Sequence, residues 1–321
     1  MLFQTIPLYP DRTDVTLTTY IQQDSPELLN GKRRPAVLIC PGGAYLSCSD
    51  REAEPVALAF AAMGYHAFVL RYSTLFGGST VWPDFSKEPD PRPESRYPNP
   101  VWEIGQSVLL LHDRAAEWQI DTDKIAVCGF SAGAHNAAMY GVYWHTPLLS
   151  AHFGRPAADF KPAAVVLGYT LSDYCFMKKN AAAANPMDVA LFNASNIGYL
   201  GTKTPTDALL AEVSPALQVS AHTPPMFLWA TSADALVPVQ HTLRMARALA
   251  DQNIPFELHI FENGPHGLSL ATQETASAQS QVDRDAAKWV GLADAWLQKR
   301  FALPLPEKTD WEDALQANGV L

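Results

Sequence analysis

Short apolar runs recur along this chain, and stretches with a helical spacing of apolar residues separate them. Short continuous runs bounded by turn residues suit buried strands, whereas longer periodic stretches suit helices. An early segment, 15–22, alternates apolar and polar positions and is typical of an antiparallel edge strand. The expected strands are 36–40, 67–71, 125–128, 163–167, 226–230 and 256–261, and the expected helices are 52–63, 104–118, 132–144, 239–251 and 282–300.

Strands and helices that alternate at this spacing predict an α/β fold with a mostly parallel central sheet and helices on both faces. Two stretches break the alternation. The segment 77–100 is rich in proline and carries aromatic residues, which indicates an ordered loop, and the segment 174–222 is alanine-rich and partly helical. Both follow carboxyl ends of strands, where parallel-sheet proteins build ligand sites. We therefore expect a single domain over 1–321, with a loop insertion at about 77–100 and a small cap-like insertion at about 174–222.

Residues 129–133 have the sequence Gly-Phe-Ser-Ala-Gly, between an apolar strand and small residues that favour a helix. This strand–turn–helix setting is the one in which the serine of a G-x-S-x-G motif becomes a nucleophile. Glycines on both sides let strand and helix approach closely around a strained backbone. The turn holds the hydroxyl above the sheet, and the helix N-terminus favours developing negative charge. Ser131 is therefore the candidate nucleophile.

A serine nucleophile needs a base that accepts its proton. The chain has nine histidines, and one of them, His266, lies on a glycine- and proline-rich loop directly after the last expected strand. A base on such a loop can reach over the edge of the sheet. We therefore predict that His266 is the base and that the other histidines are structural or exposed.

The base in turn needs a carboxylate that orients it. Asp234 follows the strand expected at 226–230 and lies on the loop before a helix. Asp173, just after the preceding strand, is the rival, and Asp207 inside the insertion is less suited. A helix cap or turn is the alternative role for Asp234. With Asp234 as the acid, the chain order of nucleophile, acid and base is that of an α/β-hydrolase sheet.

Backbone N–H groups must also stabilise the oxyanion of the reaction. One normally comes from the residue after the nucleophile, which is Ala132 here. A second must come from the loop after the strand 36–40, where residues 41–45 are Pro-Gly-Gly-Ala-Tyr. Paired glycines let this backbone turn its amides toward a substrate, although Pro-Gly-Gly alone would be an ordinary turn.

Composition restricts the partners and the compartment. The net charge is −10 and no run is rich in lysine or arginine, which argues against nucleic acid and anionic membrane surfaces as partners. The N-terminus lacks a basic segment followed by an apolar core, and no apolar run approaches the length of a membrane span. We expect a cytoplasmic protein without a signal peptide. The four cysteines show no C-x-x-C spacing, so we expect buried, reduced thiols.

Taken together, these motifs resemble those of a known family. The chain is similar to an α/β-hydrolase of the esterase/lipase type, in particular the carbohydrate acetyl-esterase-like (acetyl xylan esterase-like) branch. The resemblance covers about residues 35–300. It rests on P-G-G-A-Y at 41–45, D-R-E-A-E-P-V-A-L-A-F at 50–60, G-Y-H-A-F-V-L-R-Y-S at 64–73, G-F-S-A-G-A-H at 129–135, A-D-A-L-V-P at 233–238 and P-H-G at 265–267.

The resemblance implies both a catalytic triad and an oxyanion hole. The chain departs from the H-G-G-G pattern of many lipases and esterases, because Pro41 replaces the histidine and Ala44 the last glycine. This departure argues against the hormone-sensitive-lipase branch. The implied triad is Ser131, Asp234 and His266, and the implied oxyanion donors are Gly43 and Ala132, with Gly42 or Ala44 assisting.

The expected reaction is two-step ester hydrolysis through an acyl-enzyme, with no metal or organic cofactor. The resemblance implies a short acyl group, in the first place acetyl, on a sugar or polyol, so the expected partner is a small ester such as an acetylated carbohydrate. A homo-oligomer is compatible with the sequence. Aromatic residues near the predicted loops could stack on sugar rings, with core packing as the alternative for each: Tyr45, Trp82, Tyr97 and Trp102.

Two other functions fit parts of the pattern. A serine peptidase of the prolyl-oligopeptidase branch shares the surroundings of the serine and histidine, but this chain has no additional propeller-sized domain. A binding protein on an inactive hydrolase fold is the second. Such proteins usually lose the nucleophile or the base, whereas both Ser131 and His266 are present here.

Overall fold

The computed structural model describes residues 1–321 except 26, 29–30, 79–86, 181–185, 304, 306 and 321. In the described part of the chain, eight strands form one sheet in the order β1-β2-β4-β3-β5-β6-β7-β8. The strands are β1 Leu2–Tyr9, β2 Arg12–Ile21, β3 Arg34–Cys40, β4 His66–Arg71, β5 Ile120–Phe130, β6 Ala164–Gly168, β7 Met226–Thr231 and β8 Phe256–Phe261.

The strands from β3 to β8 pair in parallel and are connected through helices. This arrangement confirms the predicted α/β fold with a mostly parallel sheet. The described helices are α1 Glu54–Ala62, α2 Asn99–Asp113, α3 Ala115–Trp118, α4 Ala132–Tyr143, α5 Pro147–Phe153, α6 Tyr174–Asn180, α7 Pro186–Leu200, α8 Asp207–Glu212, α9 Gln240–Asp251, α10 Trp289–Phe301 and α11 Asp310–Ala317.

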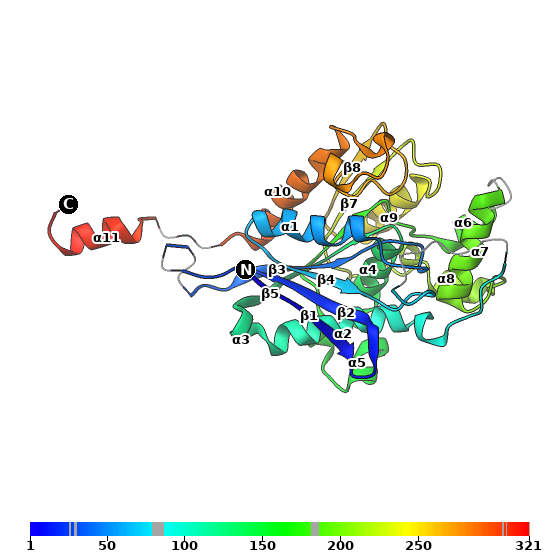
Figure 1. The fold of residues 1–321 in the computed structure, drawn as a ribbon, viewed down its shortest axis with the longest axis horizontal. Coiled ribbons are helices and arrows are strands. Elements are labelled where there is room, and N and C mark those ends of the chain that lie inside the picture. The colour runs from blue at the N-terminus through cyan, green and yellow to red at the C-terminus, as the bar shows by residue number, and fades with distance from the viewer. Residues whose placement is uncertain are drawn as a thin grey trace.

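Helices cover both faces of the sheet, which explains why the central strands are apolar throughout. Successive residues of β3 point to opposite faces, so Leu38 belongs to one apolar cluster and Ile39 to the other. Residues of α2, α4 and α9 complete the first cluster, and residues of α1 and α10 complete the second. Figure 1 shows α1 and α10 on one side of the sheet and α2 on the other.

The antiparallel strand predicted at 15–22 is present as β2, but its predicted place at the edge of the sheet is wrong. β2 lies between β1 and β4 and pairs antiparallel with both. β1 forms the edge instead. Its first residues are exposed and it carries Pro7, which is tolerated at an edge, so its sequence lacks the alternation of a half-buried strand.

The alanine-rich stretch 174–222 contains α6, α7 and α8. Figure 1 shows these helices beyond the ends of the parallel strands, at the opposite end of the molecule from α11. α7 packs closely on the loop that follows β3, because a Cβ on Gly198 would lie 3.2 Å from the carbonyl oxygen of Tyr45. The insertion is thus attached to the loop in which the sequence predicts oxyanion donors.

The four cysteines lie in the described part of the chain and are unpaired. Cys40, Cys48 and Cys128 are buried as expected, whereas Cys175 is half-buried. None of the described helices combines the length and the apolar character that a membrane crossing requires.

Two glycines allow β5 and α4 to meet at the turn around Ser131. A Cβ on Gly129 would lie 2.3 Å from the carbonyl oxygen of Gly133. A Cβ on Gly133 would lie 2.0 Å from the carbonyl oxygen of Cys40, at the end of β3. Both contacts are with backbone atoms, which cannot rotate away as a flexible side chain would. The elbow therefore requires glycine at both positions.

We expect Gly133→Ala to lower the free energy of unfolding by about 3 kcal/mol, because the new methyl group overpacks the junction of β3, β5 and α4. Gly291→Ala in α10 is the matched control. No atom lies within 4 Å of a Cβ there, so alanine should raise stability by about 0.5–1 kcal/mol through its helix propensity. Urea unfolding of both variants measures the difference, and equal effects would contradict this account of the elbow.

Candidate active site

Ser131 occupies the tight turn between β5 and α4. Its backbone has φ 51° and ψ −118°, a conformation that L-residues rarely adopt. Its N–H donates to the carbonyl oxygen of Gly168 at 3.0 Å, so β6 holds the turn in place. The residue precedes the first turn of α4, and its side chain is partly accessible to solvent.

The structure brings three of the predicted site residues into one chain of contacts. The Oγ of Ser131 lies 2.7 Å from Nε2 of His266, and Nδ1 of His266 lies 2.7 Å from Oδ2 of Asp234. When Nδ1–H donates to the carboxylate, Nε2 remains an acceptor for the serine hydroxyl. This arrangement can remove the serine proton while the carboxylate orients the imidazole.

Asp234 is fixed on its other side by the protein backbone. Its Oδ1 accepts hydrogen bonds from the N–H groups of Leu236 and Val237, at 3.0 and 2.9 Å. Its side chain is 1% exposed, and that of His266 is 13% exposed. The carboxylate can therefore hold the ring at a fixed angle, while the ring itself remains accessible from the serine side.

The two rival aspartates have other partners. Asp173 accepts a hydrogen bond from the N–H of Phe176 and forms an ion pair with Arg244 at 3.2 Å. Asp207 pairs with Lys178 on the surface of the insertion. Asp173 thus begins a helix, the role that was the structural alternative for Asp234.

The predicted oxyanion donors come from the residue after the serine and from the loop after β3, which reaches the serine at Gly42. Ala132 is the first residue of α4, so its N–H has no acceptor in a preceding turn of helix. Gly43 has φ +133°, and a Cβ there would lie 2.2 Å from the carbonyl oxygen of Ser47, so the loop requires glycine. Gly42 packs directly against the serine, since a Cβ on Gly42 would lie 2.9 Å from Cβ of Ser131.

The assisting role predicted for Gly42 has to be corrected. Its N–H donates to Oε2 of Glu52 at 2.7 Å and is not free for a substrate. Glu52 is 3% exposed, and its other oxygen accepts from the hydroxyl of Tyr169. Tyr169 also packs edge-on against His266, with ring centroids 5.0 Å apart.

Sequence reasoning selected neither Glu52 nor Tyr169. Tyr169 directly follows β6, and this place at a strand end is the only signal that points to it. Glu52 lies in a charged stretch before α1 that resembles an ordinary exposed turn. Its contacts depend on tertiary structure.

The prediction that Tyr45 lines a substrate pocket is wrong. The side chain is 1% exposed and belongs to the apolar core. Its hydroxyl lies 2.5 Å from Nδ1 of His135, and its ring stacks on Tyr199 with centroids 4.0 Å apart. His135 in turn contacts the carbonyl oxygen of Val213 through Nε2 at 2.8 Å. Tyr45 therefore joins the loop after β3 to α4 and α7.

Two of the other aromatic candidates are described, and both pack against the protein core. Trp102 stacks on His152 with centroids 3.7 Å apart and donates its indole N–H to the carbonyl oxygen of Leu148. Tyr97 is half-buried and packs against the main core. These contacts favour core packing for both, and a sugar-binding role for them stays a prediction. Trp82 lies outside the described residues.

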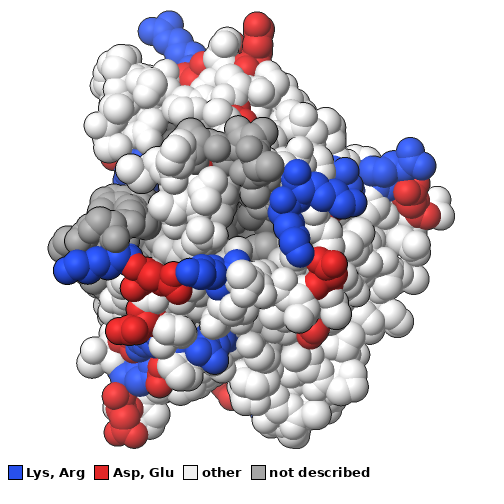
Figure 2. Space-filling view, turned by 90° about the vertical axis from the view of Figure 1, so that its right-hand side faces the viewer, with Lys and Arg blue, Asp and Glu red and all other residues white. Residues whose placement is uncertain are grey.

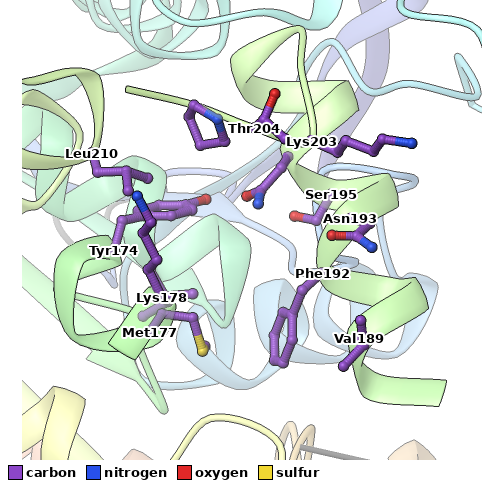
Figure 3. A pocket seen from close by; sticks show the side chains of 13 residues that line it. Tyr174, Met177, Lys178, Val189, Phe192, Asn193, Ser195, Lys203, Thr204 and Leu210 are labelled. Atoms are coloured by element: carbon purple, nitrogen blue, oxygen red, sulfur yellow. The ribbon is translucent and has the colours of Figure 1, made fainter. Parts of the chain in front are cut away.

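A cavity of about 300 Å³ lies within the insertion, between α6, α7 and α8. Figure 3 shows Met177 of α6 and Phe192 of α7 facing it from different helices. Neither Ser131 nor His266 is among the described residues that line it. Figure 2 shows the end of the molecule that carries this insertion. Positively charged and negatively charged side chains lie next to one another on this face.

Within the described ranges, no group of three or more His, Cys, Asp or Glu side chains gathers so as to hold a metal ion. The chemistry that the residues themselves offer is that of a serine hydroxyl, an imidazole and a carboxylate in one line. This constellation recurs in acyl-transfer enzymes on unrelated folds.

Comparison with known proteins places this site in a family. The sequence model of the family described as BD-FAE matches residues 25–249. The chain belongs to the BD-FAE family. Its solved structural neighbours place this BD-FAE protein among esterase-type α/β-hydrolases.

Three relatives illustrate the family. MGS-M1, an α/β-hydrolase enzyme from a Medee basin deep-sea metagenome library, is 33% identical, with a TM-score of 0.69 over 94% of this chain and 99% of that one. An acetyl ester-xyloside bifunctional hydrolase from Caldicellulosiruptor lactoaceticus is 28% identical, with a TM-score of 0.69 over 92% and 96%. Endo-1,4-beta-xylanase B of Butyrivibrio fibrisolvens is 30% identical over 77% of this chain. The chain spans 34% of that xylanase, and less than half the length of the other curated relatives it matches.

Acid should destabilise the fold through His135. Burial lowers the pKa of this histidine from 6.5 to about 4. The unfolded chain therefore binds the proton first, so the stabilisation is present above pH 6.5 and is lost as pH falls toward 4. We expect this loss to reach about 3 kcal/mol. His135→Gln should remove that part of the pH dependence, and urea unfolding between pH 4 and 7.5 measures it. An unchanged slope in the variant would contradict the assignment.

Proposed function

We propose that this protein is a serine ester hydrolase in which Ser131, His266 and Asp234 form the catalytic triad. The observation that carries this proposal is the pair of 2.7 Å contacts that run from the serine hydroxyl through the imidazole to the carboxylate. Membership of the BD-FAE family supports the same chemistry.

The reaction begins when His266 takes the proton of Ser131 and the Oγ attacks the ester carbonyl. The negative charge on the carbonyl oxygen is held by the N–H groups of Gly43 and Ala132. His266 then protonates the departing alcohol, which leaves an acyl-enzyme. Water, deprotonated by the same imidazole, attacks the acyl group and releases the acid. Asp234 keeps the ring in the required tautomer and stabilises the imidazolium form.

The proposed substrate is a small ester with a short acyl group, in the first place acetyl, on a sugar or polyol. The name of the Caldicellulosiruptor relative supports an acetyl ester, and that of the Butyrivibrio relative supports a xylan-related carbohydrate. We further propose that the insertion with α6–α8 is a small cap of one α/β-hydrolase domain. The close packing of Gly198 against the loop of Tyr45 supports this arrangement.

Substitution of the triad should remove turnover without unfolding the protein. We expect Ser131→Ala to lower kcat for p-nitrophenyl acetate at least about 1000-fold, and Asp234→Asn to lower it by a similar factor, because the tautomer is lost. Asp173→Asn is the matched control, since Asp173 is a buried aspartate outside the triad. Its activity should stay within about twofold of wild type. Circular dichroism checks that each variant is folded.

Covalent labelling and a comparison of substrates separate the competing functions. Wild-type protein should form a covalent adduct at Ser131 with a fluorophosphonate, and the alanine variant should not. Absence of an adduct in the wild type would support a binding protein on an inactive hydrolase fold. Faster cleavage of aminoacyl anilides than of acetate esters would support a peptidase.

The acyl group can be tested independently of the triad. We expect kcat/KM to be highest for acetyl esters and to fall about tenfold or more at octanoyl, because a short acyl pocket excludes additional methylene groups. Acetylated xylo-oligosaccharides should release acetate, which an enzymatic acetate assay measures. Rapid cleavage of octanoyl esters without acetate release would reject the acetyl assignment and leave the triad intact.

A further inference from the structure

Two loops of the proposed site come from distant parts of the chain and meet at one buried carboxylate. Gly42, beside the oxyanion donors, donates its N–H to Oε2 of Glu52 at 2.7 Å. Tyr169, after β6, donates its hydroxyl to Oε1 at 2.6 Å. Glu52 is 3% exposed, so both bonds lie away from solvent. A buried carboxylate with two fixed donors can set their relative positions.

Tyr169 extends the connection to the loop of the base. Its hydroxyl accepts the N–H of Ser269 at 3.0 Å, three residues after His266. Its ring packs edge-on against the imidazole, with centroids 5.0 Å apart. Burial and then the neighbouring Glu52 raise the pKa of Tyr169 well above its ordinary value, so the hydroxyl keeps the proton that it donates. The carboxylate of Glu52 is thus connected to His266 through a single intervening side chain, that of Tyr169.

The residue before Glu52 holds the same loop from outside. Arg51 donates through Nη2 to the carbonyl oxygen of Gly267 at 2.8 Å, and its own carbonyl oxygen accepts from Oγ of Ser269 at 2.6 Å. Trp289, the first residue of α10, donates its indole N–H to the carbonyl oxygen of Ser269 at 2.8 Å. The short turn Asp50–Glu52 therefore contacts both the oxyanion loop and the loop of the base.

Packing leaves little freedom at this junction. A Cβ on Gly42 would lie 2.7 Å from Oε2 of Glu52 and 2.9 Å from Cβ of Ser131, so the glycine backbone is held between the carboxylate and the proposed nucleophile. Burial of a carboxylate costs free energy unless hydrogen bonds compensate for it. An apolar side chain could fill the same space without that cost. It could not fix an amide and a hydroxyl at once.

We propose that Glu52 is a positioning residue that holds the oxyanion loop and the loop of His266 in register, acting through Gly42 and Tyr169. This inference rests on the proposed function. Glu52 is not a member of the proposed triad, and its two oxygens bond Gly42 and Tyr169. It acts by keeping the Gly43 amide at the place where the oxyanion forms while His266 faces Ser131. Displacement of either loop misplaces one charge-stabilising group in the transition state.

Glu52→Gln tests this role, because the two donors bond different carboxylate oxygens and the NH2 group that replaces one of those oxygens cannot accept a hydrogen bond. We expect kcat for p-nitrophenyl acetate to fall about 10- to 100-fold, with KM within about threefold of wild type. The inhibition constant of a trifluoromethyl ketone, whose serine adduct carries an oxyanion, should rise by the same factor as kcat/KM falls. Tyr169→Phe should give a similar loss, and the double variant should be no worse than the more damaged single variant.

Glu103→Gln is the matched control. Glu103 is also a buried carboxylate, but it bonds the backbone N–H of Ser73 at 2.6 Å and has no contact with the site. Its kcat should stay within about twofold of wild type. A folded Glu52→Gln protein with wild-type kcat/KM, or equal losses in the Glu52 and Glu103 variants, would overturn the proposal.

Hydrogen exchange separates this inference from the proposed function. Peptides that cover 42–49 and 264–271 should both exchange faster in Glu52→Gln than in wild type, and neither should change in Glu103→Gln. If the wild type labels with a fluorophosphonate but exchange is unaltered, the positioning role fails alone. If exchange changes but the wild type hydrolyses no ester, the proposed function fails and the connection between the loops stands.

Discussion

The carbonyl oxygen of Cys40 ends β3 directly against Gly133, and a methyl group cannot enter between them. This backbone contact brings β3, β5 and α4 together at the elbow. Ser131 has its unusual backbone conformation at this junction and lies beside Gly42 of the loop after β3. The positions of the proposed nucleophile and of the oxyanion donors depend on this close contact. A larger side chain would move the loops apart before it altered any reacting atom.

Parallel pairing then determines which other loops can reach the serine. The strands from β3 to β7 all end at the same edge of the sheet, so the segments after β3, β5, β6 and β7 become neighbours. The loop after β8 adds His266, which reaches Asp234 in the loop after the neighbouring strand β7. Ser131 and Ala132 share the turn after β5, and Gly43, Asp234 and His266 each come from a different loop. The sheet supplies their common geometry, and side-chain bonds between the loops, such as those of Glu52, refine it.

The sequence was sufficient to select the three residues that the structure brings into contact and most of the parallel strands, because each has a local cause. Ser131 lies in a strand–turn–helix motif, and Asp234 and His266 directly follow apolar runs. The sequence was insufficient where the exposure of a strand or the tertiary packing of a side chain determines the structure. β1 is an edge strand with little burial, so no periodicity marks it. Tyr45 is an aromatic residue in a glycine loop, and only the position of α7 shows that its ring is buried. Glu52 gains its partners from segments about 10, 117 and, through Tyr169, more than 200 residues away.

The bond from Trp289 to the loop of His266 also determines when the site can be completed during synthesis. The elbow around Ser131 needs β3, β5 and α4, which all belong to the first half of the chain. The loop of the histidine is anchored by Arg51 and by α10, and that helix is synthesised after all eight strands of the described sheet. A nascent chain therefore displays its serine long before an imidazole is fixed beside it. The site can be completed only when α10 packs on the second face of the sheet and anchors the loop of His266.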